Sequence, residues 1–179
     1  MNHSHNSDGN HAESPQEAHV SSLKKFIPLI TIFAIIILFT VVMQLARGGF
    51  DLLFSMGNFM GSFFIIFGGF KLVKWSGFVE AYRTYDVLAK KSVVYAYAYP
   101  LIEIALGVAY LTAFELLITN WVTLIIMVIS SIGVARELAK KVQIPCACLG
   151  AVFKIPMTKV TLFEDILMAV MALIMILLM

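Results

Sequence analysis

Long apolar stretches alternate with short polar ones along most of this 179-residue chain. Leu52–Val73, for example, is 22 residues long and carries one charge, Lys71, near its end. A helix needs about 20 apolar residues to cross about 30 Å of hydrocarbon. Five stretches meet or approach this length, and we expect each to be a membrane-spanning helix. They are Phe26–Leu45, Leu52–Val73, Val93–Phe114, Trp121–Ala135 and Thr161–Met179.

The composition agrees with this pattern. Hydrophobic residues make up 60% of the chain and charged residues 13%, with a mean hydropathy of +0.91, whereas a soluble domain carries about 25% charged residues. We therefore predict an all-α membrane protein, a four-helix transmembrane bundle with one additional N-terminal transmembrane helix. Its predicted parts are a disordered tail that holds all four histidines (1–22), the additional helix (23–46) and the four-helix domain (52–179).

The basic residues predict an orientation in the membrane. With five spans, 12 of the 13 lysines and arginines fall on one side, and Arg47 falls on the other. Because basic residues favour the cytoplasmic side, we expect a multi-pass protein of the cell (inner) membrane with its N-terminus in the cytoplasm and its C-terminus outside. The lipid bilayer is then its first partner, and a net charge of only +2 gives no support to nucleic-acid binding.

Cys146 and Cys148 are the only cysteines of the chain, and they lie in a turn bounded by Pro145 and Gly150. A Cys-x-Cys pair supplies an attacking and a resolving thiol, and a disulfide in so small a ring is strained and easily reduced. Two thiolates also suit a soft metal ion such as Cu(I) or Zn(II). A third interpretation is that the pair stays reduced and only packs.

Glu103 lies inside the third predicted span. An ionisable residue at membrane depth is costly and usually has a partner or a function. Lys71, near the end of the second span, is one candidate partner, and protonation of Glu103 is another way to remove the charge. Pro100, three residues earlier, frees a backbone carbonyl and favours a kink. A structural ion pair and a functional site both remain open for Glu103.

The last apolar stretch opens with two acidic residues, Glu164 and Asp165. Negative charge is stabilised at a helix N-terminus, which is the simpler interpretation. Alternatively, these carboxylates lie near the cysteine pair, where they relay protons or add a hard ligand.

Four methionines of the last apolar stretch share one helix face, which favours apolar packing over a row of Cu(I) ligands. They are Met168, Met171, Met175 and Met179.

Two further patterns concern packing. Gly57, Gly61 and Gly68 share one helix face, and small residues let helices approach closely in lipid, so we expect contacts within the chain rather than a dimer. Five tyrosines surround the start of the third span, and we expect them to anchor the membrane interface rather than to form a quinone pocket. They are Tyr82, Tyr85, Tyr95, Tyr97 and Tyr99.

Four segments in a fixed order carry a family resemblance: Phe64–Lys71, Gly77–Tyr85, Tyr99–Gly107 and Cys146–Gly150. They combine Gly-x-x-Lys, Pro-x-x-Glu and Cys-x-Cys-x-Gly. Over about residues 57–179 the chain resembles the MauE family, small membrane proteins related to DoxX and named after methylamine utilisation. The family motif commonly has a glycine between the cysteines and an aromatic residue after them, where this chain has Ala147 and Leu149.

The resemblance implies a redox-associated membrane role in the maturation of disulfide-bearing periplasmic proteins. In a thiol-redox protein, Cys146 and Cys148 would exchange electrons with a partner protein or a membrane quinone, and Glu103 would be an intramembrane proton site. A second hypothesis is a copper- or zinc-handling protein in which Cys146 and Cys148 bind the metal, together with the methionine face of the last span and the histidine tail. A third is a non-catalytic assembly factor for another membrane protein. The chain has no Ser-His-Asp set and no nucleotide-binding glycine loop, so any enzyme activity would be thiol–disulfide chemistry at most.

Overall fold

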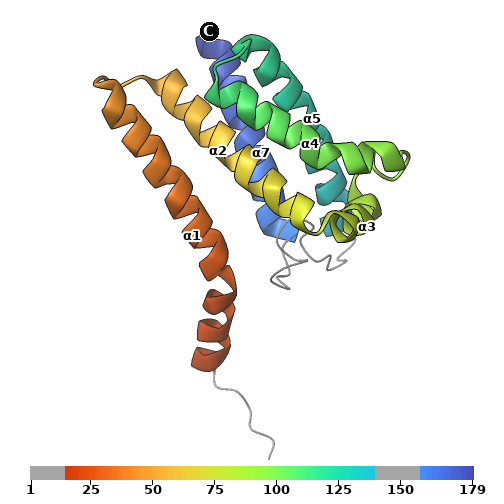
Figure 1. Cartoon of the computed structure of the whole chain (residues 1–179). Coiled ribbons are helices and arrows are strands. Elements are labelled where there is room, and N and C mark those ends of the chain that lie inside the picture. The colour runs from red at the N-terminus through yellow and green to blue at the C-terminus, as the bar shows by residue number, and fades with distance from the viewer. Residues whose placement is uncertain (1–14, 140–157) are drawn as a thin grey trace, which may run out of the picture.

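The computed structural model of the chain describes residues 15–139 and 158–179. In these two ranges every regular element is a helix: α1 (Pro15–Arg47), α2 (Leu52–Val73), α3 (Trp75–Tyr85), α4 (Val93–Leu111), α5 (Leu116–Ala139) and α7 (Thr158–Leu178) (Figure 1). Five segments are long and apolar enough to cross a membrane: Ile27–Arg47, Leu52–Val73, Val93–Leu111, Leu116–Arg136 and Thr161–Leu178. The prediction of an all-α membrane protein with five spans is confirmed.

Four spanning helices, α2, α4, α5 and α7, form a bundle, and α1 lies against its outside (Figure 1). The most extensive helix pairs are α2 with α4 and α5 with α7. α1 packs on α2 near its C-terminal end and diverges from the bundle toward its N-terminal end. Large apolar side chains of α1, such as Ile30 and Leu38, are exposed, as expected for a helix that faces lipid.

Some helix boundaries differ from those expected. α1 begins at Pro15, inside the 1–22 segment predicted to be a disordered tail, while residues 1–14 lie outside the described ranges. α4 ends at Leu111 and the fourth span begins at Leu116 rather than Trp121. Between them Ala113 and Glu115 adopt positive φ angles of 52° and 39°, which non-glycine residues rarely do. A tight turn therefore replaces residues assigned to the third span and lets α5 start earlier.

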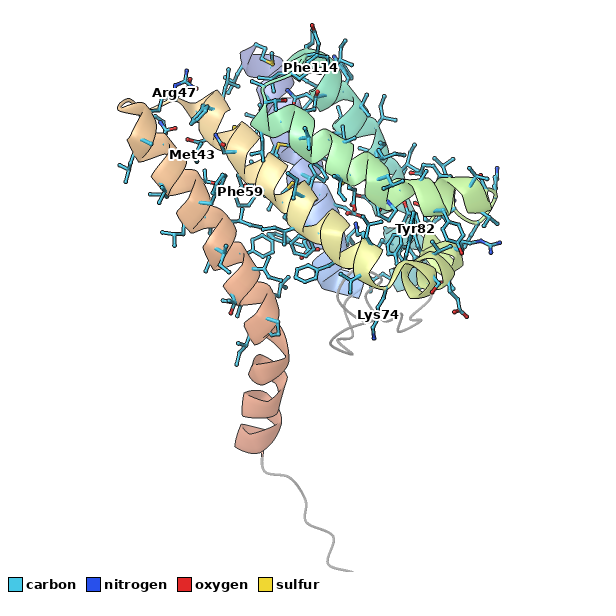
Figure 2. All side chains as sticks on the ribbon, viewed as in Figure 1. Met43, Arg47, Phe59, Lys74, Tyr82 and Phe114 are labelled. Carbon is cyan, nitrogen blue, oxygen red and sulfur yellow. The ribbon has the colours of Figure 1, made fainter. Side chains whose placement is uncertain are left out.

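Helix α3 is an element that the sequence analysis left in a loop. Its buried residues, Phe78, Val79, Tyr82 and Tyr85, recur at helical spacing, and Arg83 is exposed. Such a pattern is that of an amphipathic helix with one face on a protein surface. Figure 2 shows Lys74 and Tyr82 near one end of the bundle, with Arg47 and Phe114 at the opposite end. α3 therefore covers one end of the bundle.

Glycines set the distance between α2 and α4. A Cβ built on Gly61 would lie 2.9 Å from the carbonyl oxygen of Gly107, and one built on Gly107 would lie 2.9 Å from that of Gly61. Real Cβ atoms do not approach backbone oxygen so closely, so the helices meet where neither has a side chain. Gly57 and Gly68 also face α4. The expectation that these glycines pack within the chain is confirmed.

Aromatic and methionine side chains fill the interior of the bundle. Phe63 and Phe67 of α2 stack with their ring centroids 4.3 Å apart, and Phe33 of α1 packs against both. Met168 and Met175 of α7 are fully buried in the same apolar cluster. This part of the methionine face is therefore used for packing, as the simpler interpretation expected.

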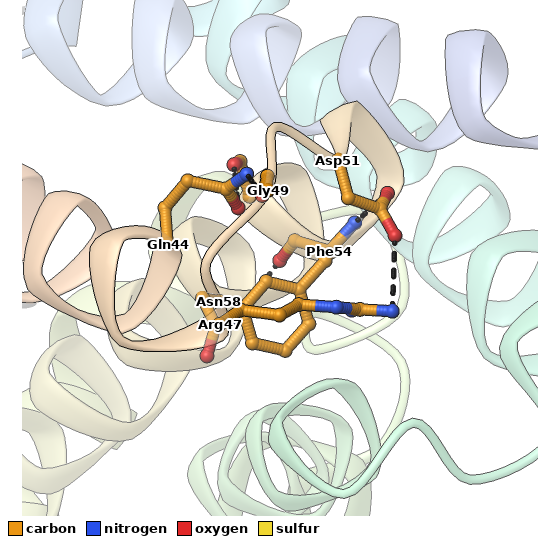
Figure 3. Close-up of polar contacts among 7 residues, drawn as sticks. Gln44, Arg47, Gly49, Asp51, Phe54 and Asn58 are labelled. Carbon is orange, nitrogen blue, oxygen red and sulfur yellow. Dashed lines mark hydrogen bonds and ion pairs between the residues drawn. The ribbon is translucent and has the colours of Figure 1, made fainter.

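Polar contacts hold the turn between α1 and α2 (Figure 3). The Oδ1 atom of Asp51 accepts a hydrogen bond from the Phe54 N–H at 3.0 Å, which caps α2. The Oδ2 atom of Asp51 lies 3.2 Å from Nη2 of Arg47, and the Arg47 guanidinium lies over the Phe54 ring. Gln44 donates a hydrogen bond to the Gly49 carbonyl at 2.5 Å. The turn thus fixes the C-terminal end of α1 against α2.

Candidate functional site

Lys71 of α2 and Glu103 of α4 form an ion pair inside the bundle. The two residues are 8% and 3% exposed. The Lys71 Nζ atom also lies 4.8 Å from the ring centroid of Tyr99 and 5.6 Å from that of Phe78. Both rings present a negative face to the ammonium group. The structure thus makes the contact between Lys71 and Glu103 that the sequence suggested, and Pro100 lies buried one turn before Glu103.

Asp165 of α7 and Ser130 of α5 form a second buried contact. The Ser130 hydroxyl donates a hydrogen bond to Oδ2 of Asp165 at 2.7 Å. Asp165 is 8% exposed and Ser130 3%. Asp165 also interacts electrostatically with Lys71 and Glu103, so the two contacts belong to one cluster shared by α2, α4, α5 and α7.

Asp86, in the connection between α3 and α4, is a third buried carboxylate and is fully enclosed. Its Oδ1 atom accepts hydrogen bonds from the N–H groups of Leu88 at 2.9 Å and Ala89 at 2.7 Å. Gly133 of α5 lies directly against this segment. A Cβ built on Gly133 would lie 2.8 Å from the Tyr85 carbonyl oxygen and 3.0 Å from the Asp86 Cα. The close approach of α5 therefore encloses Asp86.

Tyrosines from α3 and α4 stack beside the ion pair. Tyr82 packs against Tyr99 and Phe78 with ring-centroid distances of 4.5 and 5.0 Å, and Tyr85 and Tyr95 complete the group. Tyr82, Tyr85 and Tyr99 are buried, so interfacial anchoring was the wrong prediction for them. The reason is that α3 folds its apolar face onto α4.

The remaining tyrosine of the predicted set, Tyr97, lies on another face of α4. It is exposed and meets Trp75, whose indole N–H donates to the Tyr97 carbonyl at 3.1 Å. That position fits the interfacial role expected of all five tyrosines.

For Tyr82, outside the membrane spans, burial raises the pKa of the phenol well above its ordinary value, and neighbouring Tyr99 adds to the effect. The Tyr82 hydroxyl therefore stays protonated and able to donate a hydrogen bond.

Glu164 and Asp165 do not open the last helix. α7 begins at Thr158, and its first turn contains no acidic residue. Both side chains are buried, Glu164 being 4% exposed and Asp165 8%. Stabilisation by the helix N-terminus is therefore the wrong explanation for them, because the helix starts further upstream than its apolar stretch. They are carboxyl groups turned into the bundle.

The cysteine pair and Gly150 lie in residues 140–157, outside the described ranges. The two helix ends that border this segment are described: α5 ends at Ala139 and α7 begins at Thr158. Ser130 lies nine residues before the first of these ends and Asp165 seven residues after the second. At 1.5 Å per residue, the polar cluster is roughly 10 to 14 Å along either helix from the points where the cysteine-bearing segment joins.

A preformed metal centre is not found in residues 15–139 and 158–179, since no three His, Cys, Asp or Glu side chains gather there closely enough to hold an ion. The buried Met168 and Met175 are committed to packing. The metal hypothesis therefore rests on residues outside those ranges, namely Cys146, Cys148, His3, His5 and His11.

The cluster can hold protons and charge away from water. Its groups are an ammonium, three carboxyl groups and hydroxyl donors, and burial makes each charge depend on its neighbours. Sequence reasoning missed Ser130 and Asp86. Ser130 is a small polar residue within an apolar span, and Asp86 lies in a polar connection where solvation is the ordinary expectation. For Asp86 the available signal was the neighbouring tyrosines, since Tyr95 and Tyr99 share a helix face.

Comparison with known proteins finds one family. The model of a family described as methylamine utilisation protein MauE matches residues 49–178. The match begins after α1, includes α2 to α7 and covers most of the chain. Searches of curated proteins and of solved structures find no match.

Proposed function

Because the chain belongs to the MauE family, we propose that it serves methylamine utilisation as a membrane protein that exchanges thiols and disulfides with a partner protein through Cys146 and Cys148. One observation supports this most. The helices that border the cysteine-bearing segment, α5 and α7, share a hydrogen bond between Ser130 and Asp165 in the buried polar cluster. Groups that hold protons thus lie near the entry of a segment whose chemistry releases and takes up protons.

The exchange balances in two steps. One thiolate of the pair attacks a disulfide of the partner, and a mixed disulfide forms as the partner's first thiolate leaves. The second thiolate of the pair then attacks the mixed disulfide, which closes a bond between Cys146 and Cys148 and frees the partner's second thiolate. The partner gains two electrons and two protons, and the pair loses them. In reverse, the same steps leave a disulfide in the partner.

We also infer that the end of the bundle covered by α3 faces the cytoplasm of the cell (inner) membrane. Five exposed basic residues lie at this end, namely Lys74, Arg83, Lys90, Lys91 and Arg136. At the opposite end Arg47 is paired with Asp51. This distribution follows the positive-inside rule, which supports an N-terminus inside and a C-terminus outside.

Trapping of the thiols in growing cells tests the proposal. Acid quenching followed by alkylation separates reduced from oxidised pairs, and in Cys148→Ser the attacking thiol can form a mixed disulfide that is not resolved. We expect a partner linked to Cys148→Ser or Cys146→Ser that reductant releases and that is absent from the double variant. Ser131→Ala, which leaves both thiols in place, is the matched control and should behave as the parent protein.

Two results would contradict the proposal. The first is a pair that stays reduced under all growth conditions, with no linked partner in either single variant. The second is undiminished growth on methylamine with the double variant. If a partner still co-purifies with that double variant, a non-catalytic assembly factor explains the protein better. Cu(I) or Zn(II) retained by the purified protein and lost from the double variant would instead favour metal handling.

A further inference from the structure

We propose that Asp165 is a proton-binding site, protonated at neutral pH and held by Ser130 beside an ionised pair of Lys71 and Glu103. Nothing in the thiol chemistry is needed for this site to exist. Its ligand is a proton, taken up and released inside the transmembrane bundle.

Glu103, Asp86 and Asp165, three of the four buried carboxyl groups of the described residues, differ in their donors. Glu103 accepts from the Lys71 ammonium, and Asp86 accepts from the two backbone N–H groups of Leu88 and Ala89. Asp165 accepts from a neutral hydroxyl, that of Ser130. A buried carboxylate is stable where a cation or several donors compensate for lost water. Asp165 has the weakest such support and is therefore the group that carries a proton.

The hydrogen-bonding atoms left over also bear on the site. Glu103 is 3% exposed and Asp86 is fully buried, yet the Oε2 atom of Glu103 and the Oδ2 atom of Asp86 accept no hydrogen bond from any described residue. The buried Tyr82 hydroxyl likewise has no hydrogen-bond partner among the described residues, so unpaired acceptors and an unpaired donor both remain. Protonation turns a carboxyl oxygen from an acceptor into a donor, so a protonated carboxyl group has one acceptor fewer to satisfy.

The charged groups around Asp165 come from every side of the cluster. Lys71 faces it from α2, Tyr99 and Glu103 from α4, and Asp86 from the connection after α3. Glu164 precedes it in α7. Lys71 is the one cation of this described set, and its ammonium already contacts Glu103. Ionised Asp165 would therefore have to share this one cation with Glu103, and a second negative charge beside a single cation is costly inside a bundle.

A proton at this position can be exchanged with the segment that joins α5 to α7. Reduction of a disulfide there takes up two protons, and protonated Asp165 can supply one of them, which it regains when the two thiols are oxidised again. This use of the site rests on the proposed function, whereas the protonated carboxyl group itself does not. The test below therefore measures the proton and not the thiol exchange, so the two ideas can fail separately.

Infrared spectroscopy of the full chain in lipid vesicles tests the site. A protonated carboxyl group gives a C=O stretching band that carboxylates lack and that shifts in D₂O. We expect this band at neutral pH in the parent protein, its loss in Asp165→Asn and its persistence in Glu103→Gln. Asparagine is close in shape to the protonated acid, so Asp165→Asn should retain the helical content of the parent.

Ser130→Ala gives a second readout that keeps Asp165 in place. Loss of the hydrogen bond to Oδ2 should move the C=O band to higher frequency, because a free carbonyl stretches at higher energy. The proposal is overturned if the parent protein lacks the band at neutral pH, or if the band survives in Asp165→Asn. A band that is lost in Glu103→Gln instead, or one that Ser130→Ala leaves unmoved, assigns the proton to another group and equally overturns it.

Discussion

Lys71 and Glu103 stabilise each other because neither could remain charged alone at this depth in the bundle. Both are nearly inaccessible to water, and transfer of an isolated charge into such a place is strongly unfavourable. The rings of Tyr99 and Phe78 lie close to the ammonium group and take over part of its solvation. The contact therefore depends on both partners at once.

A double-mutant cycle should reveal this dependence. Lys71→Met and Glu103→Gln should each destabilise the protein, Lys71→Met by about 3–5 kcal/mol because it leaves a buried carboxylate without its counter-ion. The double variant should cost less than the sum of the two. Unfolding by denaturant in mild detergent measures the cycle, and exposed Lys74→Met is the control, expected to stay within about 0.5 kcal/mol. Strictly additive costs would show that the two charges do not support each other.

The sequence could predict this contact but not the role of Asp165. A lysine and a glutamate inside apolar stretches are conspicuous, since charges are rare at membrane depth. Asp165 instead lies at the boundary between a polar and an apolar segment, where water is the expected neighbour. Only the upstream start of α7, at Thr158, turns this boundary position into a buried one.

Helices α2 and α4 are held at short range by glycines that face each other. In lipid no hydrophobic force presses helices together, so close backbone contact and van der Waals packing carry more of the association. The ion pair of Lys71 and Glu103 spans the same two helices. The spacing set by Gly61 and Gly107 thus also sets the distance over which these charges meet.

Enlarging Gly61 should separate the helices. Gly61→Val places side-chain atoms against the backbone of α4, and overpacking of this kind costs about 1–3 kcal/mol. Gly69→Val in the same helix meets open space and should cost much less. Thermal unfolding of the two variants in detergent compares them directly. Equal losses of stability would mean that the helix pair does not depend on this contact.

The N-cap of α2 gives a smaller, local prediction. Asp51→Ala removes the acceptor for the Phe54 N–H and should destabilise the protein by about 1 kcal/mol. Asp51→Asn keeps an acceptor but loses the charge that pairs with Arg47, and an exposed ion pair contributes little. Asp51→Asn should therefore lie close to the parent in thermal unfolding. A loss as large as that of Asp51→Ala would assign the stabilisation to the ion pair.

The sequence predicted the bounds of a helix correctly where an apolar run alone defines that helix. α2 has the bounds expected from its apolar run, Leu52–Val73. α3 was missed because eleven residues with both charged and aromatic side chains are too short and too polar to resemble a span. Its apolar positions 78, 82 and 85 do share a helical face. That signal was present but was interpreted as loop tyrosines and basic residues.

At the scale of the whole molecule, the bundle is polarised. One end has α3, the buried charges and five exposed basic residues, and the other has short turns and the C-terminus (Figure 1). The number of spans followed from the sequence, because a run of about 20 apolar residues has few alternatives to a membrane helix. The convergence of four helices on one polar cluster did not follow, since it depends on how the helices are rotated.

Labelling of single cysteines tests the orientation of the molecule. In a background of Cys146→Ser and Cys148→Ser, Phe114→Cys should react with a membrane-impermeant maleimide in intact cells. Lys90→Cys should react only after the membrane is opened. Both positions are exposed. Phe114 lies at one end of the bundle (Figure 2), and Lys90 belongs to the connection between α3 and α4. Full reaction of both in detergent is the control, and the reverse pattern would invert the orientation inferred from the basic residues.

Gly133 is a position outside the cysteine pair at which most substitutions should damage the protein. The atoms that a Cβ at this position would meet belong to the backbone of residues 85 and 86, and backbone cannot rotate aside as a side chain can. Alanine and valine each lie one nucleotide change from any glycine codon, and both would push α3 off α5. Loss-of-function mutations should therefore arise at codon 133 while both cysteine codons stay intact. In such variants water would reach the buried carboxyl group of Asp86, which the close approach of α5 otherwise encloses.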